Sequence, residues 1–144
     1  MSEGNGVYRH MIRVPYAHVD QMRFVYYANY LVYFEMARTG MLREAGTPYS
    51  TLEEKGVLLP VMAAHCEYRQ PAHYEDLLAV DVNFPAFKGV RFRLDYKVWR
   101  VESGAGPTPG EDALLVEGYT EHVCMSPDGK VLRPDPAFKQ LAGH

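Results

Sequence analysis

The chain has 144 residues, of which 47% are hydrophobic and 23% charged, a length and balance that suit one globular domain over residues 1–144. Its formal net charge of −3 provides no overall positive field for nucleic acid or an anionic membrane. No apolar run approaches the roughly 20 residues that span a bilayer and the N-terminus lacks a signal-peptide pattern, so we expect a cytoplasmic protein without nucleic-acid partners or membrane insertion.

The first predicted element is a short strand. Ile12, Val14 and Tyr16 alternate with other residues at a period of two, which is typical of a strand with one buried face. His18 and Asp20 continue the even positions, so Asp20 would point to the apolar face if the strand runs on. A carboxylate there is costly unless chemistry requires it, and a helix or turn cap is the alternative role.

A helix over residues 27–45 is predicted next. Its apolar residues repeat at about 100° per residue, and Gly46 and Pro48 predict its end. This helix is the longest in the prediction, so its apolar arc requires a sheet to cover. The arc contains Tyr30, Leu31, Phe34, Ala37, Met41, Leu42 and Ala45.

Arg38 falls within this arc on the helical projection. Because an unpaired charge is costly in a core, we expect a carboxylate partner, either Glu35 on the same helix or Asp76 before a later strand. We interpret Arg38 as structural, and Glu35 as a weaker candidate for a second catalytic group.

The rest of the chain is predicted to be mainly antiparallel strands with turns between them. Lys88-Gly89 resembles a two-residue hairpin loop, and the segment from Glu102 to Asp112 is rich in glycine and proline, which predicts a mobile loop. The order of elements gives an α+β domain with one helix against a curled sheet. The strands are expected at residues 57–69, 78–84, 90–98 and 113–125, with a short one after Pro127-Asp128-Gly129 and a helical turn at Asp135-Pro136.

Residues 16–38 read Tyr-Ala-His-Val-Asp-Gln-Met-Arg-Phe-Val-Tyr-Tyr-Ala-Asn-Tyr-Leu-Val-Tyr-Phe-Glu-Met-Ala-Arg. This run resembles the signature of the 4-hydroxybenzoyl-CoA thioesterase family of hot-dog proteins: an aspartate, two aromatic residues, a tyrosine and a Phe-Glu-x-Ala-Arg run. The segments 70–77 and 117–119 are also similar to the family, and the resemblance covers about residues 8–136. It implies the hot-dog fold, in which a curled antiparallel sheet of five to six strands wraps one long central helix.

One position departs from the family pattern. The family commonly has glycine three residues after the aspartate, where this chain has Arg23 followed by Phe24. The close backbone approach that glycine permits is expected to change here, and the resemblance is a weaker guide to the substrate for that reason.

The resemblance implies an acyl-CoA thioesterase with Asp20 as nucleophile or general base, two roles that the sequence does not separate. It also places the backbone amide of Tyr27 at the helix N-terminus, facing the thioester oxygen. The first amides of a helix lack intrahelical partners and favour developing negative charge. Phe24 and Tyr26 are candidates for the acyl pocket, with core packing as the alternative.

The other implied features concern partners. Lys88 and Arg91 are candidates for binding the CoA phosphates near a subunit boundary, although a solvated strand face is the simpler explanation for either residue alone. The family builds its sites between subunits, so we expect a homodimer or homotetramer. A non-catalytic acyl-CoA-binding module and a hot-dog enoyl-CoA hydratase remain as alternative functions.

Neither a cofactor nor a metal is expected. The pairs His18 with Asp20 and His65 with Glu67 lack a third ligand at a diagnostic spacing. The two cysteines, Cys66 and Cys124, have no zinc-site spacing and are predicted to be free thiols.

Overall fold

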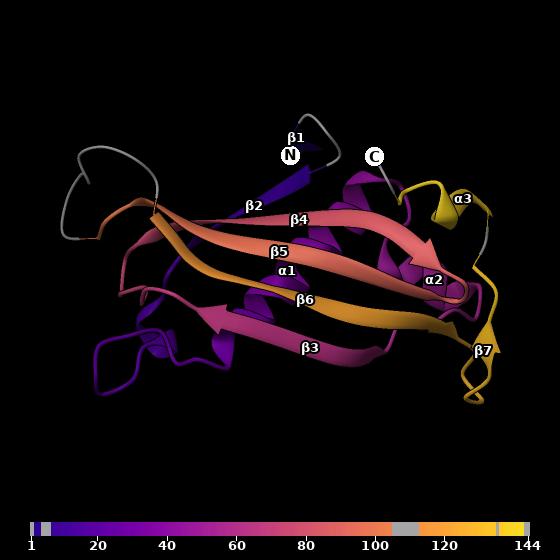
Figure 1. The fold of residues 1–144 in the computed structure, drawn as a ribbon, viewed down its shortest axis with the longest axis horizontal. Helices are drawn as coiled ribbons and strands as arrows, with labels where there is room; N and C mark the ends of the chain where they lie inside the picture. The colour runs from indigo at the N-terminus through magenta and orange to yellow at the C-terminus, as the bar shows by residue number, and fades with distance from the viewer. Residues whose placement is uncertain (1, 4–6, 105–112, 135, 143–144) are drawn as a thin grey trace.

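One helix, α1 (Asn29–Glu44), lies against the inner face of a curled antiparallel sheet (Figure 1). The computed structural model describes residues 2–3, 7–104, 113–134 and 136–142. Most of the predicted loop after Glu102, and Asp135, lie outside the described residues. The strands are β1 (Ser2–Glu3), β2 (Val7–Arg13), β3 (Val61–Tyr68), β4 (Leu77–Lys88), β5 (Arg91–Glu102), β6 (Ala113–Met125) and β7 (Val131–Leu132); the other helices are α2 (Tyr49–Glu54) and α3 (Pro136–Lys139).

The strand order in the sheet is β1-β2-β4-β5-β6-β3, with β7 paired to β6 beside it. Five long strands and two strands of two residues are described, and α1 packs on β2 and β4. The predicted α+β class and hot-dog architecture are confirmed. None of the described helices has the length and apolar character needed to cross a membrane.

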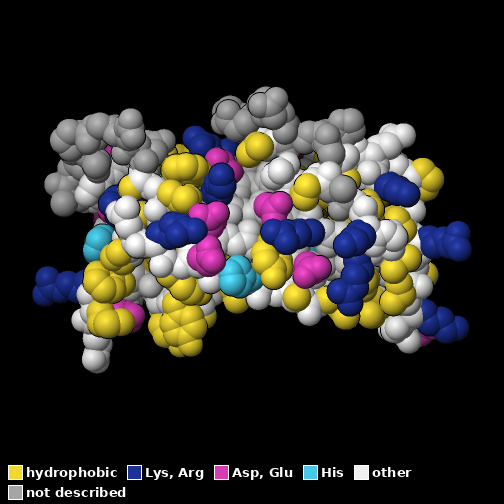
Figure 2. Space-filling model, viewed as in Figure 1, with side chains coloured by type: hydrophobic (Ala, Val, Ile, Leu, Met, Phe, Trp, Pro, Cys, Tyr) yellow, Lys and Arg dark blue, Asp and Glu magenta, His cyan; other side chains and the backbone are white. Residues whose placement is uncertain are grey.

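The two faces of the sheet differ as the period of two predicts. In β5 the side chains of Phe92, Leu94, Tyr96 and Val98 are buried in the hydrophobic core. The outer face instead carries ion pairs, with Nε–Oδ1 distances of 2.7 Å for both Arg9–Asp81 and Arg93–Asp95. Figure 2 shows basic, acidic and histidine side chains interspersed over this face.

The β4–β5 hairpin turns one residue later than predicted. Lys88 still pairs with Arg91 in the ladder, so Gly89 and Val90 form the loop. Gly89 has a φ of +67°, which a glycine adopts without steric cost. The position of the hairpin loop is therefore determined by Gly89, the residue that tolerates a positive φ.

Helix α1 begins two residues after the predicted start. The amides of Asn29 and Tyr30 donate to the carbonyls of Tyr26 and Tyr27, so the first turn is a tighter 3₁₀ turn. The predicted end is confirmed, because Gly46 lies just beyond Glu44 with a φ of +84°. Its amide donates to the Arg43 carbonyl at 3.1 Å, and the Thr47 amide donates to the Leu42 carbonyl at 2.9 Å, which is a Schellman motif.

The buried face of α1 is rotated from the predicted arc. Tyr33 and Arg38 are buried, whereas Leu31 is 41% exposed and Ala45 is also exposed. The ring of Phe34 stacks on that of Tyr96 with centroids 4.1 Å apart. This stacking fixes which side of the helix faces the sheet.

The predicted carboxylate partner of Arg38 is wrong. Its guanidinium donates from Nε to the Tyr49 hydroxyl at 2.8 Å and from Nη1 to the Tyr96 hydroxyl at 3.1 Å. Asp76, the proposed partner, is buried elsewhere and lies 3.7 Å from Arg100. Two phenol oxygens therefore satisfy a buried cation, a possibility that the helical projection could not show.

A buried chain of hydrogen bonds continues from Tyr96. Its hydroxyl lies 2.7 Å from Thr120 Oγ1, which lies 2.7 Å from His122 Nε2, and His122 Nδ1 lies 3.2 Å from the Leu59 carbonyl oxygen. Arg38 only donates and the carbonyl only accepts. The polar hydrogens of these three side chains therefore all have acceptors when Tyr96 donates to Thr120, Thr120 donates to Nε2, and neutral His122 donates from Nδ1.

This arrangement predicts that His122 makes stability depend on pH. Burial and the nearby charge of Arg38 lower its pKa to about 4 from an ordinary value of 6.5. Between these pH values the unfolded chain binds a proton that the folded chain does not, so stability falls as the pH drops from 6.5 toward 4. The loss attributable to His122 is roughly 3 kcal/mol at most.

Urea unfolding at several pH values measures this dependence. His122→Gln keeps hydrogen-bonding groups but does not titrate, so its stability should fall less steeply with decreasing pH than that of the parent. Equal slopes in the two proteins would contradict the assignment.

Candidate active site

Asp20 lies in a turn, and its predicted place on an extended strand is wrong. β2 ends at Arg13, and a 3₁₀ turn at Tyr16–His18 separates the strand from Asp20. Pro15 precedes that turn and has no amide hydrogen to continue a ladder. The even-position argument for Asp20 therefore does not apply, and its place depends on the turn itself.

The turn presents the Asp20 carboxylate in a defined orientation. The Asp20 amide donates to the Phe24 carbonyl and the Arg23 amide donates to the Asp20 carbonyl, both at 2.9 Å. Asp20 Oδ1 accepts from the Met22 amide at 2.8 Å. No hydrogen bond to Oδ2 is found among the described residues, so one carboxylate oxygen is held and the other is available to a ligand.

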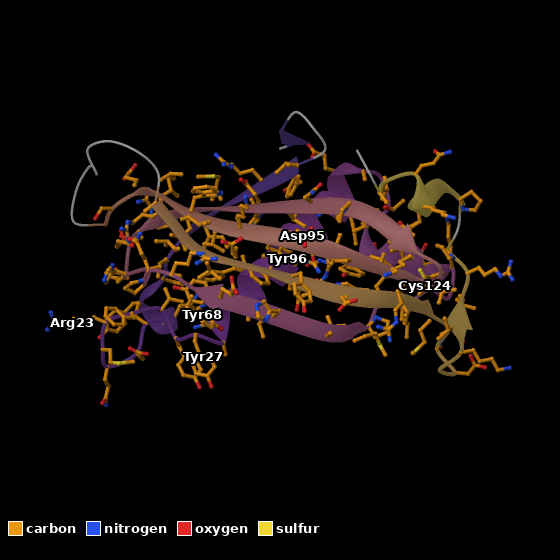
Figure 3. All side chains as sticks on the ribbon, in the orientation of Figure 1. Arg23, Tyr27, Tyr68, Asp95, Tyr96 and Cys124 are labelled. Atoms are coloured by element: carbon orange, nitrogen blue, oxygen red, sulfur yellow. The ribbon has the colours of Figure 1, made fainter. Side chains whose placement is uncertain are left out.

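Arg23 adopts a backbone conformation that favours glycine. Its φ is +69°, in the left-handed region that L side chains rarely enter. Its side chain extends away from the protein (Figure 3) and is exposed. A positive φ at this position is one that glycine would adopt without steric cost.

The turn is anchored to α1 through His18. The carbonyl of His18 accepts from the Tyr26 amide at 2.9 Å and from Asn29 Nδ2 at 3.1 Å, and its Nδ1 lies 2.9 Å from the Tyr33 hydroxyl. His18 therefore links the turn that carries Asp20 to the start of the helix. In the part of the chain that the structure describes, no three His, Cys, Asp or Glu side chains form a metal-binding group.

A pocket of about 280 Å³ lies between this turn, the start of α1 and the end of β3. It brings together three of the predicted site residues: Asp20, Phe24 and Tyr27. It is lined by Asp20, Met22, Phe24, Val25, Tyr27, Tyr30, Tyr68, Arg69, Gln70 and Pro71.

The Tyr27 amide is suited to receive an acceptor. It lies in the turn that leads into α1, and no acceptor for it is found among the described backbone and side-chain groups. An amide at this end of a helix is an electropositive donor. The residue that carries this amide thus lines the same pocket as Asp20.

Sequence reasoning missed the aromatic wall of this pocket. The Tyr68 hydroxyl donates to the Tyr27 carbonyl at 3.3 Å, and the Tyr30 hydroxyl accepts from the Ala72 amide at 3.2 Å. Partial burial raises the pKa of Tyr68 to about 12, and burial also raises the pKa of Tyr30. Both phenols are therefore neutral at physiological pH.

The remaining predicted site residues lie outside this pocket. Tyr26 is 47% exposed and packs against the Tyr27 ring at 4.8 Å. Lys88 and Arg91 are at the tip of the β4–β5 hairpin, at the opposite end of the sheet from Tyr27 (Figures 1 and 3). Within one chain the structure does not bring these two cations to the pocket.

Comparison with known proteins places the chain in a family. The model of the thioesterase-like superfamily matches residues 14–140. The chain belongs to the thioesterase-like superfamily. The resemblance noted at residues 16–38 is thereby confirmed.

Relatives of this thioesterase-like chain include the putative acyl-CoA thioesterase YneP of Bacillus subtilis, 34% identical over 114 residues, or 79% of this chain and 76% of that protein. A crystal structure of a hypothetical protein from Aquifex aeolicus is 27% identical, with a TM-score of 0.82 over 93% of this chain and 98% of that one. A 4-hydroxybenzoyl CoA thioesterase structure, 19% identical, has a TM-score of 0.83 over 94% and 98% of the two chains. The last comparison shows the fold alone.

The positive φ of Arg23 predicts that Arg23→Gly stabilises this thioesterase-like protein. Removing the left-handed strain yields about 1 to 2 kcal/mol, and the greater freedom of glycine in the unfolded chain offsets about 0.5 to 1 kcal/mol of it. We expect a net gain of about 0.5 to 1 kcal/mol in urea unfolding. Met22→Gly, at a neighbouring position without a positive φ, should give no gain; a loss of stability in Arg23→Gly would contradict the strain.

Proposed function

We propose that the protein hydrolyses the thioester of an acyl-CoA, with the Asp20 carboxylate and the Tyr27 amide as its catalytic groups. The observation that carries this proposal is that Asp20 and Tyr27 line one pocket at the start of α1. The name of the Bacillus subtilis relative as a putative acyl-CoA thioesterase supports the substrate class. Membership of the thioesterase-like superfamily supports the reaction.

The Tyr27 amide would donate to the thioester carbonyl oxygen as negative charge develops on it. Such a donor is typically worth roughly 3 to 4 kcal/mol of barrier, and the helix terminus adds a favourable field.

As nucleophile, Asp20 would attack the carbonyl carbon and expel the CoA thiolate, and water would then cleave the mixed anhydride. As general base, it would take a proton from the attacking water while the carbon–sulfur bond breaks. Both routes consume one water and release free acid and CoA.

The neighbouring aromatic residues suit the acyl group. Phe24 lines the pocket, and the rings of Tyr30 and Tyr68 lie 5.6 Å apart on its other side. Their neutral phenols offer hydrogen bonds without adding charge. Tyr26, packed against Tyr27, would contact substrate at the outer edge of this group.

We further propose that two copies pair through β3. This strand is at the edge of the sheet, and an unpaired edge is a template for another strand. Val61 and Met62 on β3 are 46% and 49% exposed, and Tyr68 at its end is 49% exposed. Antiparallel pairing of two β3 strands about a two-fold axis would cover these side chains and close one side of the pocket.

This pairing would also affect the CoA end of the substrate. Because the two-fold axis reverses the strand direction, the β4–β5 hairpin of a second copy would lie at the same end of the dimer as the pocket. Lys88 and Arg91 would thereby approach the CoA phosphates across the subunit boundary, the role predicted for them from the sequence. Assembly beyond the dimer, and the cytoplasmic location, stay predictions.

Asp20→Asn should remove most of the hydrolysis and leave binding nearly unchanged. The amide has the size of the carboxylate and its oxygen can still accept from the Met22 amide, but it is a poor nucleophile and base. A positioned base is worth about 10² to 10⁴ in rate, so kcat should fall by that order. Release of free CoA measures turnover, and calorimetry with a non-hydrolysable acyl-CoA analogue measures binding.

Gln21→Ala serves as the control, since Gln21 is exposed in the same turn and does not line the pocket. Turnover of Asp20→Asn within about threefold of the parent would exclude Asp20 as the catalytic carboxylate, and Glu35 would be the next residue to change. Tight binding without thiol release from any acyl-CoA by the parent protein would instead identify a binding module.

The double variant Val61→Lys, Met62→Lys should dissociate the dimer, because charges on an edge strand oppose strand pairing. Light scattering should give twice the chain mass of 16.4 kDa for the parent and a single chain mass for the variant. Val131→Lys, at an exposed position on β7, should remain dimeric. A parent protein that is monomeric at micromolar concentration and fully active would contradict the β3 interface.

A further inference from the structure

A second pocket lies at the end of the molecule opposite to Tyr27. Its volume is about 280 Å³, and Cys124, one of its lining residues, is labelled at this end in Figure 3. It shares no residue with the Asp20 pocket. The lining residues are Thr47, Leu52, Lys55, Val57, Cys124, Arg133 and Phe138.

One wall of this pocket is formed by the end of α2. Gly56 has a φ of +76°, its amide donates to the Glu53 carbonyl, and the Val57 amide donates to the Leu52 carbonyl at 2.8 Å. This is a second Schellman motif, in which the residues corresponding to Leu52 and Val57 are commonly in hydrophobic contact. The motif also fixes the backbone of Lys55 at the C-cap.

The opposite wall is formed by the end of β6. Leu58 and Met125 exchange two backbone hydrogen bonds of 2.7 and 2.9 Å, which hold the segment after α2 against β6. Cys124 pairs with Leu132 of β7, so the next residue, Arg133, is held beside the pocket. The walls are thus set by backbone hydrogen bonds.

The remaining apolar surface comes from Phe138 on α3. Its side chain is only 4% exposed. Its ring lies 5.4 to 5.8 Å from those of Phe84, Phe87 and Phe92, in edge-on contacts typical of a packed aromatic cluster. The pocket therefore has a fixed apolar floor.

The charged residues that line the pocket, in the part of the chain that the structure describes, are both basic. Among the described residues, Lys55 and Arg133 are the charged ones that line it, and both are exposed, which places them at the rim. Within the described ranges, neither forms an ion pair with a carboxylate. Cys124 adds no negative charge, because burial raises the pKa of its thiol to about 11.

We propose that this pocket binds a small organic monocarboxylate, with the carboxylate between Lys55 and Arg133 and the apolar body against Leu52, Val57 and Phe138. Two cations at the rim of an apolar pocket match an anion with an apolar tail, whereas inorganic phosphate would leave the floor uncovered. The volume lies just below the range of about 300 to 1,000 Å³ for drug-sized ligands, so the ligand is small. The site is separate from the catalytic pocket and does not depend on the proposed hydrolysis.

Octanoate is the probe, and amide chemical shifts of the full-length protein are the measurement. Octanoate should shift the amides of Lys55, Val57 and Cys124 in a saturable way. 1-Octanol has the same tail without the charge, and phosphate has the charge without the tail; both should bind at least about fivefold more weakly. Shifts confined to the amides around Asp20 and Tyr27, or equal affinity for phosphate and octanoate, would overturn the proposal.

The double variant Lys55→Gln, Arg133→Gln tests the two cations directly. Because both side chains are exposed, the variant should fold, and its melting temperature without ligand should match that of the parent. Its affinity for octanoate should fall about 5- to 30-fold, while the surface variant Lys130→Gln should bind octanoate as the parent does. Unchanged affinity in the folded double variant would overturn the proposed role of the cations.

Discussion

The arrangement of the whole domain depends on the packing of α1 against the inner face of the sheet. With one long helix, the fold has a single layer to cover the apolar sides of β2, β4, β5 and β6. The stacked rings of Phe34 and Tyr96 set the rotation of the helix, and the rotation in turn sets where its N-terminus points. This orientation buries Tyr33 and Phe34 and places the start of α1 beside the pocket that Asp20 and Tyr27 line.

Much of the fold follows from periodicity. The period of two in β4 and β5 predicted those strands well, since apolar and polar side chains alternate along each of them, and Gly46 predicted the helix end because its positive φ is a local requirement. α2 was missed because its six residues are too few to show a helical period. The hydrogen-bond partners of Arg38 could not be predicted from the sequence either. They are the phenols of Tyr49 in α2 and Tyr96 in β5, which come close to Arg38 only in the folded chain.

The candidate site was predictable to a different extent. Asp20, Phe24 and Tyr27 are close in sequence, so a motif could indicate all three, and they do line one pocket. Tyr68 comes from a strand 41 residues beyond Tyr27, and its place in the pocket depends on the curl of the sheet. Lys88 and Arg91 were chosen from the sequence because of their charge. Their distance from the pocket depends on the direction of the strands and on the position of the hairpin, which their residue types do not indicate.

The buried chain of hydrogen bonds from Arg38 to Leu59 has a consequence for the uniqueness of the fold. An apolar interface between a helix and a sheet can slide by one turn at modest cost, because one aliphatic contact replaces another. Here such a slide would separate Arg38 from Tyr96 and leave several desolvated polar groups without partners, each costing about 1 to 3 kcal/mol. We infer that these hydrogen bonds specify the position of α1 along the sheet. They add little net stability to the correct packing, but they make the shifted packings of α1 unfavourable.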